Sequence, residues 1–390
     1  MEVSQRARRA GAEVEALLAF FTALGERGDR PDVIDLTFGN PHEMPLAGLV
    51  GALRDAVEPR TTDWFAYKAN EQEPREVVAA ALRRELGLPY EADDVALTPG
   101  AFGAIALAFR VLADVGDEVV VPVPGWFCYG ATLRAADLVP VPVALAPDTF
   151  DLDLEAIDAA ITPRTRIVVV NSPANPTGRV YPAAALEELA RVLDAASARV
   201  GRRIWVLSDE PYRRIRFDGV PFTSPAVAYP WTLVDYSYGK VLLAPGQRLG
   251  YLAVSPHLPD DERRAVRDAL TPAQLASGWA FADAVMQHSV AALEDVSIDM
   301  VELTRKRDLM LAALGEAGYR VTRPEGTFYL WGRAPGGDAD AFAAALARRG
   351  VLVLSGSLFD RPESFRISLT ATADQLEASI PAFREVARQL

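Results

Sequence analysis

Lys240 is the residue of this chain with the clearest potential for covalent chemistry. Only three of the 40 lysine and arginine residues are lysines, at positions 68, 240 and 306. A lysine amine forms an imine with an aldehyde, whereas an arginine guanidinium stays protonated and is not nucleophilic. Taken alone, Lys240 is more simply explained as a surface charge, so the residues around it must decide between the two interpretations.

Short apolar runs recur along the chain, and each is followed by residues suited to binding or catalysis. The runs are rich in Val and Ile, do not alternate with polar residues, and lie at 95–98, 118–123, 166–170, 204–208 and 232–236. Such runs are typical of strands buried on both faces of a mainly parallel sheet with helices outside. Since ligands bind beyond the carboxyl ends of these strands, the residues that follow the runs are candidates for one common site.

The order of these candidate residues resembles that of fold-type I pyridoxal-phosphate enzymes, specifically the class I and II aminotransferase family. The resemblance covers nearly the whole chain and is carried by Tyr67, Gly100, Ala101, Phe102, Trp126, the Asn-Pro-Thr-Gly sequence at 175–178, Asp209, Tyr212, Ser237, Lys240, Arg248 and Arg366. The Asn-Pro-Thr-Gly sequence alone is a common turn, but these pieces in this order and spacing are specific. The resemblance implies an α/β fold, with a large domain built on a mainly parallel mixed sheet flanked by helices and a smaller α+β domain.

The resemblance implies a role for each residue around the cofactor ring. Lys240 is expected to form the imine with the aldehyde of pyridoxal 5'-phosphate and later to move a proton between the substrate Cα and the cofactor. Asp209 is expected to face the pyridine nitrogen and keep it protonated. Tyr212 and Asn175 would donate hydrogen bonds to the phenolic oxygen, and Trp126 would stack on the ring.

A phosphate site is implied at the start of the helix that follows the run at 95–98. The expected contacts are the backbone amides of Gly100, Ala101 and Phe102, together with Ser237 and Arg248. Two departures from the family pattern affect this site. Ala101 lacks a possible hydroxyl donor, and Gly239 precedes the lysine where many relatives have a hydroxyl residue.

The resemblance also assigns the substrate site and a partner subunit. Arg366 is expected to bind the substrate α-carboxylate bidentately, with help from Asn175 and the backbone at Gly39. Tyr67 is expected to reach the phosphate of the neighbouring subunit, which implies a homodimer.

Each of these residues has an ordinary structural explanation as well. Trp126 alone suits an apolar core, Asp209 suits a helix cap, and Tyr67 suits packing beside its aromatic neighbours. Arg248 and Arg366 are consistent with structural or strand-surface roles in a chain so rich in arginine. Their joint order favours the cofactor site over these separate explanations.

The pattern of elements divides the chain of 390 residues into two predicted domains. Residues 46–279 are expected to form the large cofactor-binding domain, and residues 1–45 and 280–390 the small domain. The expected elements of the small domain are a short strand at 33–41, a long helix at 282–317, a helix at 340–349 and strands at 351–354 and 365–369.

Composition and charge exclude several classes of function. A single cysteine, Cys128, excludes an internal disulfide, and the three scattered histidines lack ligand spacing, so no metal centre is expected. The net charge of -13 disfavours nucleic acid as a partner. Because no run approaches the roughly 18 apolar residues of a membrane span and the N-terminus lacks a secretory signal, a cytoplasmic protein is expected.

The expected reaction is the transfer of an amino group between an L-amino acid and a 2-oxo acid. The absence of lysine and arginine between Arg267 and Arg305 disfavours a dicarboxylate substrate, although Lys68 or His42 remains available. The alternative is elimination, cyclisation or oxidation of a basic amino acid such as an arginine derivative. Glu43 would then bind the substrate cation, unless it is a solvated loop carboxylate.

A non-catalytic regulator built on the same fold is a further alternative. Regulators of this kind carry a DNA-binding module ahead of the catalytic pattern. Only about 45 residues precede the pattern here, without a helix-turn-helix, and the chain is acidic. Both observations disfavour a regulator.

Overall fold

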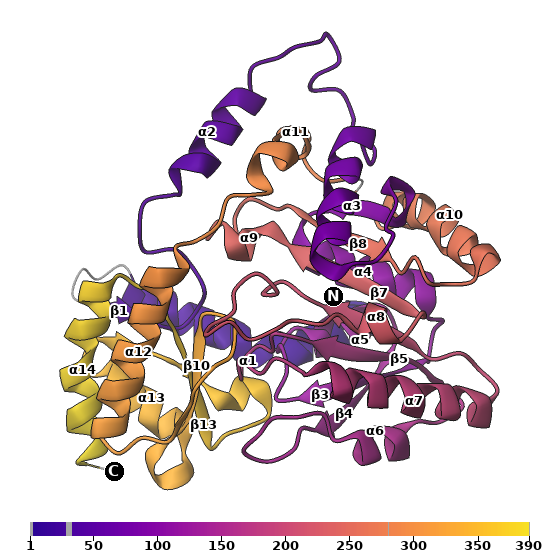
Figure 1. Cartoon of the computed structure of the whole chain (residues 1–390). Helices are drawn as coiled ribbons and strands as arrows, with labels where there is room; N and C mark the ends of the chain where they lie inside the picture. The colour runs from indigo at the N-terminus through magenta and orange to yellow at the C-terminus, as the bar shows by residue number, and fades with distance from the viewer. Residues whose placement is uncertain (1–2, 29–32, 280, 390) are drawn as a thin grey trace.

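A seven-stranded sheet forms the centre of the computed structural model, which describes residues 3–28, 33–279 and 281–389. The strand order is β2-β8-β7-β6-β5-β3-β4 (Figure 1). The strands are β2 (Val95–Thr98), β3 (Glu118–Val123), β4 (Val139–Ala144), β5 (Thr165–Asn171), β6 (Trp205–Asp209), β7 (Thr232–Ser237) and β8 (Gly250–Val254). Strand β8 runs antiparallel to both neighbours, whereas the pairs from β7 to β4 are parallel. The predicted mainly parallel mixed sheet is confirmed.

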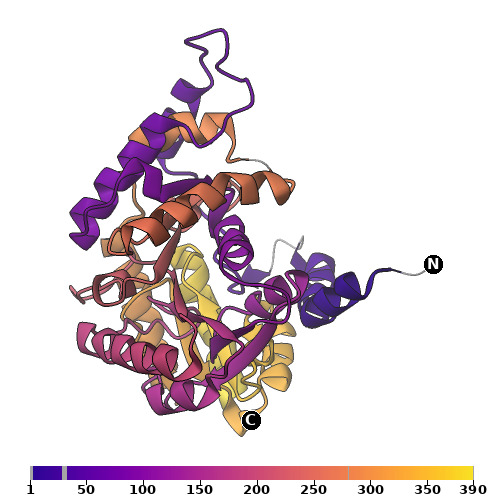
Figure 2. The same ribbon diagram turned by 90° about the vertical axis from the view of Figure 1, so that its right-hand side faces the viewer.

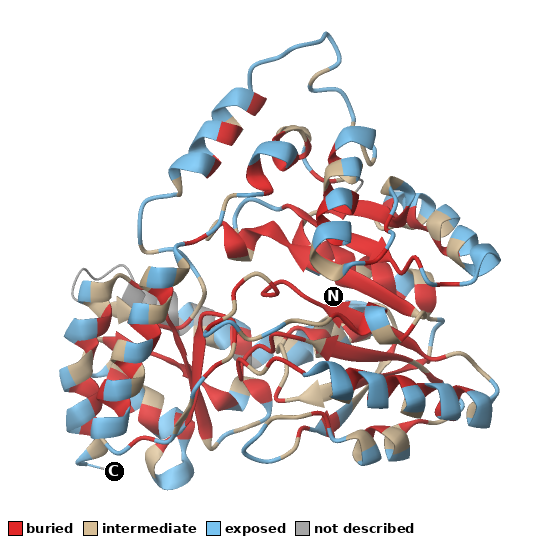
Figure 3. Ribbon diagram, in the orientation of Figure 1, coloured by how far each residue is buried: buried red, intermediate tan, exposed pale blue. Residues whose placement is uncertain are grey.

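Alternation along the strands directs side chains to two helical layers. Leu207 of β6 and Leu233 of β7 pack with α4 (Gly100–Leu112), while Val206 of β6 packs with α7 (Ala183–Val200). Because helices cover both faces, the strands are apolar along most of their length. Figure 3 shows the buried positions concentrated in the sheet and the exposed ones on the outer faces of the helices.

A smaller antiparallel sheet lies beside the large one, at the left of Figure 1. Its order is β12-β13-β10-β9, and its strands are β9 (Val321–Thr322), β10 (Tyr329–Arg333), β12 (Leu354–Ser355) and β13 (Ser364–Ser368). A parallel pair, β1 (Ile34–Asp35) with β11 (Val351–Leu352), extends this region. The core beneath it includes residues of α12 (Met300–Glu316), α13 (Ala339–Ala347) and α14 (Ala373–Ala387).

The remaining helices surround the two sheets. They are α1 (Gln5–Gly28), α2 (Ala47–Ala56), α3 (Gln72–Leu86), α5 (Tyr129–Ala135), α6 (Leu154–Ala160), α8 (Pro225–Ala228), α9 (Tyr238–Val241), α10 (Asp260–Ala276) and α11 (Ala284–Leu293), with 3-10 turns η1 (Ala92–Asp94), η2 (Pro335–Gly337) and η3 (Gly356–Phe359). Helix α1 lies along α5 at the edge of the molecule (Figure 2). In the described part of the chain, no helix is long and apolar enough to cross a membrane.

The predicted long helix at 282–317 is wrong, because two helices, α11 and α12, occupy this segment. Between them, the backbone amide of Ile298 donates to the carbonyl of Val241 at 2.9 Å, which takes the chain out of the helical path. Asp299 then caps α12 by accepting hydrogen bonds from the amides of Val301 and Glu302. The break is therefore set by a long-range hydrogen bond and a cap rather than by a change in apolar periodicity.

The predicted strand at 33–41 is much shorter in the structure. Only β1, residues Ile34 and Asp35, pairs with another strand. The Asp35 side chain accepts a hydrogen bond from the amide of Thr37 at 2.8 Å, so the chain turns directly after the strand.

The division into domains at residues 46 and 279 stays a prediction. Helix α1 packs on α5, and α11 packs on α2 and α3, so segments on both sides of the predicted boundaries contact each other. Residues 1, 2, 29–32, 280 and 390 of the predicted small domain lie outside the described residues.

Candidate active site

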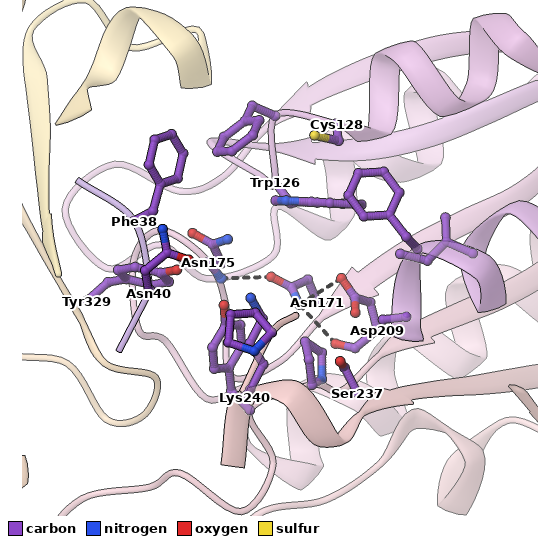
Figure 4. A pocket seen from close by; sticks show the side chains of 18 of the residues that line it. Phe38, Asn40, Trp126, Cys128, Asn171, Asn175, Asp209, Ser237, Lys240 and Tyr329 are labelled. Atoms are coloured by element: carbon purple, nitrogen blue, oxygen red, sulfur yellow. Dashed lines mark hydrogen bonds between the residues drawn. The ribbon is translucent and has the colours of Figure 1, made fainter. Parts of the chain in front are cut away.

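A cavity of about 520 Å³ opens beyond the carboxyl ends of β5, β6 and β7 (Figure 4). Residues of the small sheet complete its wall. The predicted residues that line it are Gly39, Ala101, Phe102, Trp126, Asn175, Asp209, Tyr212, Ser237, Lys240, Arg248 and Arg366. Gly100 lies beside Arg248 at the start of α4, whereas the side chain of Tyr67 is fully exposed, away from this cavity.

Asp209 is buried at the end of β6 and holds a carboxylate at the wall of the cavity. The Tyr129 hydroxyl donates a hydrogen bond to its Oδ2, and Nδ2 of Asn171 donates to the same oxygen at 3.1 Å. The other oxygen, Oδ1, is buried and has no hydrogen-bond partner among the described residues. Since a buried carboxylate oxygen needs a donor, Asp209 fits a protonated ring nitrogen bound in the cavity.

Lys240 enters the cavity from α9, directly after β7 ends at Ser237. Its Nζ lies 5.8 Å from the centre of the Tyr212 ring. In Figure 4, Trp126 lies on the opposite side of the cavity from Lys240. A planar aldehyde stacked on Trp126 therefore fits within reach of the amine.

Cys128 also lines the cavity but is a poor nucleophile. Burial raises the pKa of its thiol to about 12, although the nearby charge of Lys240 acts in the opposite direction. The thiol therefore stays protonated at neutral pH, and the thiolate is the reactive form of cysteine. Among the nucleophiles of the cavity, Lys240 is left as the candidate for covalent chemistry.

The start of α4 forms a site for an anion. Gly100, its first residue, has a φ of +74°, and a Cβ added there would lie 2.8 Å from Nη2 of Arg248. The guanidinium thus lies directly against the backbone of the first helical turn, whose amides have no acceptor within the helix. Positive charge and backbone donors at one point suit a phosphate group.

Arg366 reaches the cavity from β13 and is almost completely buried. Its Nη1 donates to Oδ1 of Asn175 at 2.8 Å, and its Nη2 donates to the carbonyl of Thr37 at 2.8 Å. The guanidinium carbon lies 3.9 Å from the centre of the Tyr329 ring. No carboxylate among the described residues pairs with this charge, so Arg366 suits the carboxylate of a bound amino acid.

Several residues of the site were not predicted from the sequence, among them Tyr129, Asn171, Phe38 and Tyr329. The pKa of the Tyr329 hydroxyl lies below its ordinary value. Burial acts to raise this pKa, but the charges of Arg366 and Lys240 and a hydrogen bond with Tyr212 lower it by more. Asn171 and Tyr129 each follow a predicted strand closely, and this position was the one sequence feature that could have indicated them as site residues. Nothing in their spacing marks them as partners of Asp209.

Glu43 does not provide a vacant anion for a basic substrate. Its Oε1 accepts a hydrogen bond from Nζ of Lys306 at 2.6 Å, and the lysine side chain is only 7% exposed. Glu43 therefore compensates a buried charge on α12. Its own side chain is 49% exposed, as expected for a loop carboxylate, and it is not a vacant contact for a substrate cation.

Solved structures with the same fold are aminotransferases. An amino transferase from Eubacterium rectale has a TM-score of 0.91 and 28% sequence identity, with 100% of this chain and 99% of that chain covered. The aspartate aminotransferase of Thermus thermophilus, solved with maleate, has a TM-score of 0.83 and 27% identity, with 99% and 100% covered. The chain thus has the fold of type I pyridoxal-phosphate enzymes, as predicted.

Sequence comparison defines the family. Residues 31–383 match the model of aminotransferase class I and II. The aspartate/prephenate aminotransferase of Thermus thermophilus is 32% identical over 367 residues, 93% of each chain, and the aspartate aminotransferase of Geobacillus stearothermophilus is 30% identical over 370 residues, 90% of each. The chain belongs to the aminotransferase class I and II family, and it is a pyridoxal-phosphate-dependent transaminase.

Proposed function

We propose that the cavity binds pyridoxal 5'-phosphate through the residues expected from the sequence. When bound, the cofactor supplies an aldehyde that takes up an amino group and a ring that accepts the electrons left at the substrate Cα. Asp209 contacts the ring nitrogen, Trp126 stacks on the ring, and Tyr212 and Asn175 donate to the phenolic oxygen. The observation that carries the proposal is that Lys240 lines the same cavity as Asp209, whose Oδ1 has no partner among the described residues.

The phosphate is bound at the first turn of α4 in this proposal. The backbone amides of Gly100, Ala101 and Phe102 donate to its oxygens, and Ser237 and Arg248 complete the site. The close approach of the Arg248 guanidinium to Gly100 supports this assignment. A dianion held there fixes the ring relative to Lys240 and Asp209.

Lys240 carries out the proton transfer. Its amine would hold the cofactor aldehyde as an imine, and the amine of the substrate would take its place and so free it. The free amine would then be placed to take the proton from the substrate Cα and to return it on the cofactor side, because Lys240 lines the cavity in which both would bind. Transfer of the amino group to a 2-oxo acid runs through the same steps in reverse.

Arg366 binds the α-carboxylate of the substrate and so orients its Cα–H bond toward Lys240. The guanidinium already contacts Asn175 and Thr37, which hold it in one place without neutralising its charge. The backbone near Gly39, on the same wall of the cavity, assists. Such preorganisation reduces the entropy lost when the substrate is positioned.

The side chain of the preferred amino acid is apolar in this proposal. The lysine and arginine residues that line the cavity are Lys240, Arg248 and Arg366, and each has a role already. The wall around them is apolar and aromatic, with Leu17 of α1 and the edge-to-face pair Phe38 and Phe127, whose ring centres are 6.4 Å apart. Among the residues of this chain that line the cavity, no further lysine or arginine is available to a second carboxylate, although relatives are named for aspartate.

The active unit is a homodimer in this proposal, and Tyr67 contributes to the site of the partner subunit. The full exposure of Tyr67 and its position outside the cavity of its own chain support this role. A cytoplasmic location is also proposed, supported by the single cysteine and hence the lack of an internal disulfide.

Amino-group exchange by the cofactor-loaded enzyme tests the proposed function. We expect one amino acid and one 2-oxo acid to be consumed for each new amino acid and oxo acid formed. Release of ammonia, a cyclic product or consumption of oxygen would instead favour elimination, cyclisation or oxidation. With Glu43 paired to Lys306, no observation favours those alternatives.

A further inference from the structure

A second buried carboxyl group, that of Asp235, lies beside Asp209. The two residues are direct partners in the parallel pair β6 and β7. Side chains at paired positions point to the same face of a sheet. Two residues earlier, Leu207 and Leu233 pack into the core on the α4 side, so alternation places both carboxyl groups on that side as well.

Among the described residues, no positive charge compensates Asp235. It is completely buried, and apart from the adjacent Asp209 neither of its carboxyl oxygens has a hydrogen-bond partner among these residues. Its partner on β8 is Leu252, and the charged residue of α4 is Arg110, which is exposed. Glu210, directly after β6, is the further charged group that acts on Asp235, and it is also acidic.

Two ionised carboxylates are not stable side by side in such a place, because burial and mutual repulsion both oppose the second charge. We infer that Asp235 keeps its proton at neutral pH and donates a hydrogen bond to Asp209, so that the pair carries one negative charge. Asp235 is then a positioning residue for the carboxylate that contacts the cofactor nitrogen. In this arrangement Asp235 donates to Asp209 in addition to Tyr129 and Asn171, which both donate to Oδ2, and a lone pair of Oδ1 stays available to the cofactor nitrogen.

The electrostatic surroundings agree with this distribution of charge. Burial raises the pKa of Asp235 well above its ordinary value, and the charge and hydrogen bond of Asp209 and the charge of Glu210 raise it further. Burial raises the pKa of Asp209 as well, but hydrogen bonds with Tyr129 and Asp235 and the charge of Lys240 act against this. The proton therefore belongs to Asp235.

The consequence concerns the strength of Asp209 as a base. A carboxylate that accepts three hydrogen bonds is less basic than an isolated one. A second ionised carboxylate would instead make the pair a stronger proton acceptor and hold the ring nitrogen more tightly. This inference uses the proposed role of Asp209 only for its consequence, since the proton on Asp235 is observable by itself.

Infrared spectroscopy of the cofactor-loaded full chain, with 13C-labelled aspartate carboxyl groups, tests the inference directly. At pH 8 we expect the carbonyl band of a protonated aspartic acid, shifted by the label, which separates it from a protonated Glu210. The band should disappear in Asp235→Asn and in Asp235→Leu, whereas Asp295→Asn, in which a 94% exposed side chain is changed, should retain it. A spectrum without a protonated aspartic acid would overturn the inference.

The pH dependence of unfolding gives an independent readout. The raised pKa of Asp235 means that the folded protein binds one more proton than the unfolded chain above pH 4, so wild-type stability falls as pH rises. The ratio of the unfolding equilibrium constant of the wild type to that of Asp235→Asn should increase about tenfold per pH unit between pH 5 and 7. Asp235→Leu serves the same comparison if the amide variant does not fold.

Parallel pH profiles for the wild type and the variants would show that Asp235 ionises as in an unfolded chain and would overturn the inference. The proposed function is tested separately, by the loss of the imine absorbance band in a Lys240 variant. If that band is lost but no protonated aspartic acid is found, the proton on Asp235 is refuted and the proposed function is not.

Discussion

Lys240, Arg248 and Arg366 carry the positive charge of the cavity, and the proposed chemistry uses all three. Lys240 reacts with the aldehyde, Arg248 lies where the phosphate would bind, and Arg366 lies ready for the α-carboxylate. A substrate with a second carboxylate would place an ionised group against Phe38 and Phe127 without a counter-charge from the residues of this chain that line the cavity. An unpaired buried charge costs more than a neutral polar group, which itself costs about 1–3 kcal/mol.

We predict that phenylalanine and leucine are better amino donors than aspartate by about 100-fold in kcat/KM, since roughly 2.7 kcal/mol corresponds to that factor. Steady-state kinetics with a panel of donors and one fixed 2-oxo acid measures the ratio. Alanine, which has neither a large apolar side chain nor a second carboxylate, is the reference donor. A kcat/KM for aspartate equal to or above that for phenylalanine would refute the apolar pocket.

Spacing along the chain predicted Lys240, Asp209 and Arg366 as cavity residues, and the structure places all three there. Their proposed roles remain to be tested. Spacing along the chain could not predict the partners of Asp209. Tyr129 reaches it from another strand end and Asp235 from the neighbouring strand, so both depend on how the strands are ordered and aligned.

At the level of elements, the first turn of α4 combines a left-handed glycine with backbone amides that have no acceptor within the helix. Gly100 adopts a left-handed conformation that places the chain against Arg248. Gly87, which ends α3, has nearly the same φ of +70°, but an added Cβ there would meet no atom within 4 Å. Comparing the same substitution at the two glycines therefore separates the backbone strain that any side chain would cause from the effect of displacing Arg248.

We predict that Gly100→Ala and Gly87→Ala lower the free energy of unfolding by a similar amount, about 1 kcal/mol. Only Gly100→Ala should weaken cofactor binding, by roughly 10- to 100-fold, because displacing Arg248 removes a charge-assisted hydrogen bond of about 1.5–3 kcal/mol. Chemical denaturation and cofactor titration measure the two effects. Equal cofactor affinity in both variants would show that the phosphate does not bind at α4.

The apolar runs predicted the five strands β2, β3, β5, β6 and β7 to within one residue at each end. Strands β4 and β8 were not predicted. The run of β4 is interrupted by Pro140 and Pro142, and β8 begins with a glycine. The division between α11 and α12 was missed because it depends on Val241, which lies more than 50 residues away in the sequence.

At the scale of the whole molecule, Tyr67 is fully exposed and lies outside the cavity of its own chain, so we predict that it completes the site of a partner subunit. Tyr67→Ala should then weaken cofactor binding about 10- to 100-fold by removing one hydrogen bond to a charged group. Sedimentation should show a dimer.

Mixed dimers of a Lys240→Ala chain and a Tyr67→Ala chain distinguish the two arrangements when they are assayed at a cofactor concentration that loads the wild type but not Tyr67→Ala. If Tyr67 acts across the interface, one site of each mixed dimer combines both defects and the other is intact, so about half of the wild-type activity returns. If Tyr67 acts within its own chain, neither site is intact and no activity returns. The latter result would contradict the proposed dimer site.

The absorbance spectrum of the chain loaded with pyridoxal 5'-phosphate tests most directly whether Lys240 binds the cofactor covalently. We predict an imine band near the edge of the visible range that is absent from Lys240→Ala, together with amino-group exchange by the wild type. Lys68→Ala, which removes a lysine that contacts only the carbonyl of Asp63 among the described residues, should retain both. A Lys240→Ala protein that kept the band and the exchange activity would contradict the account.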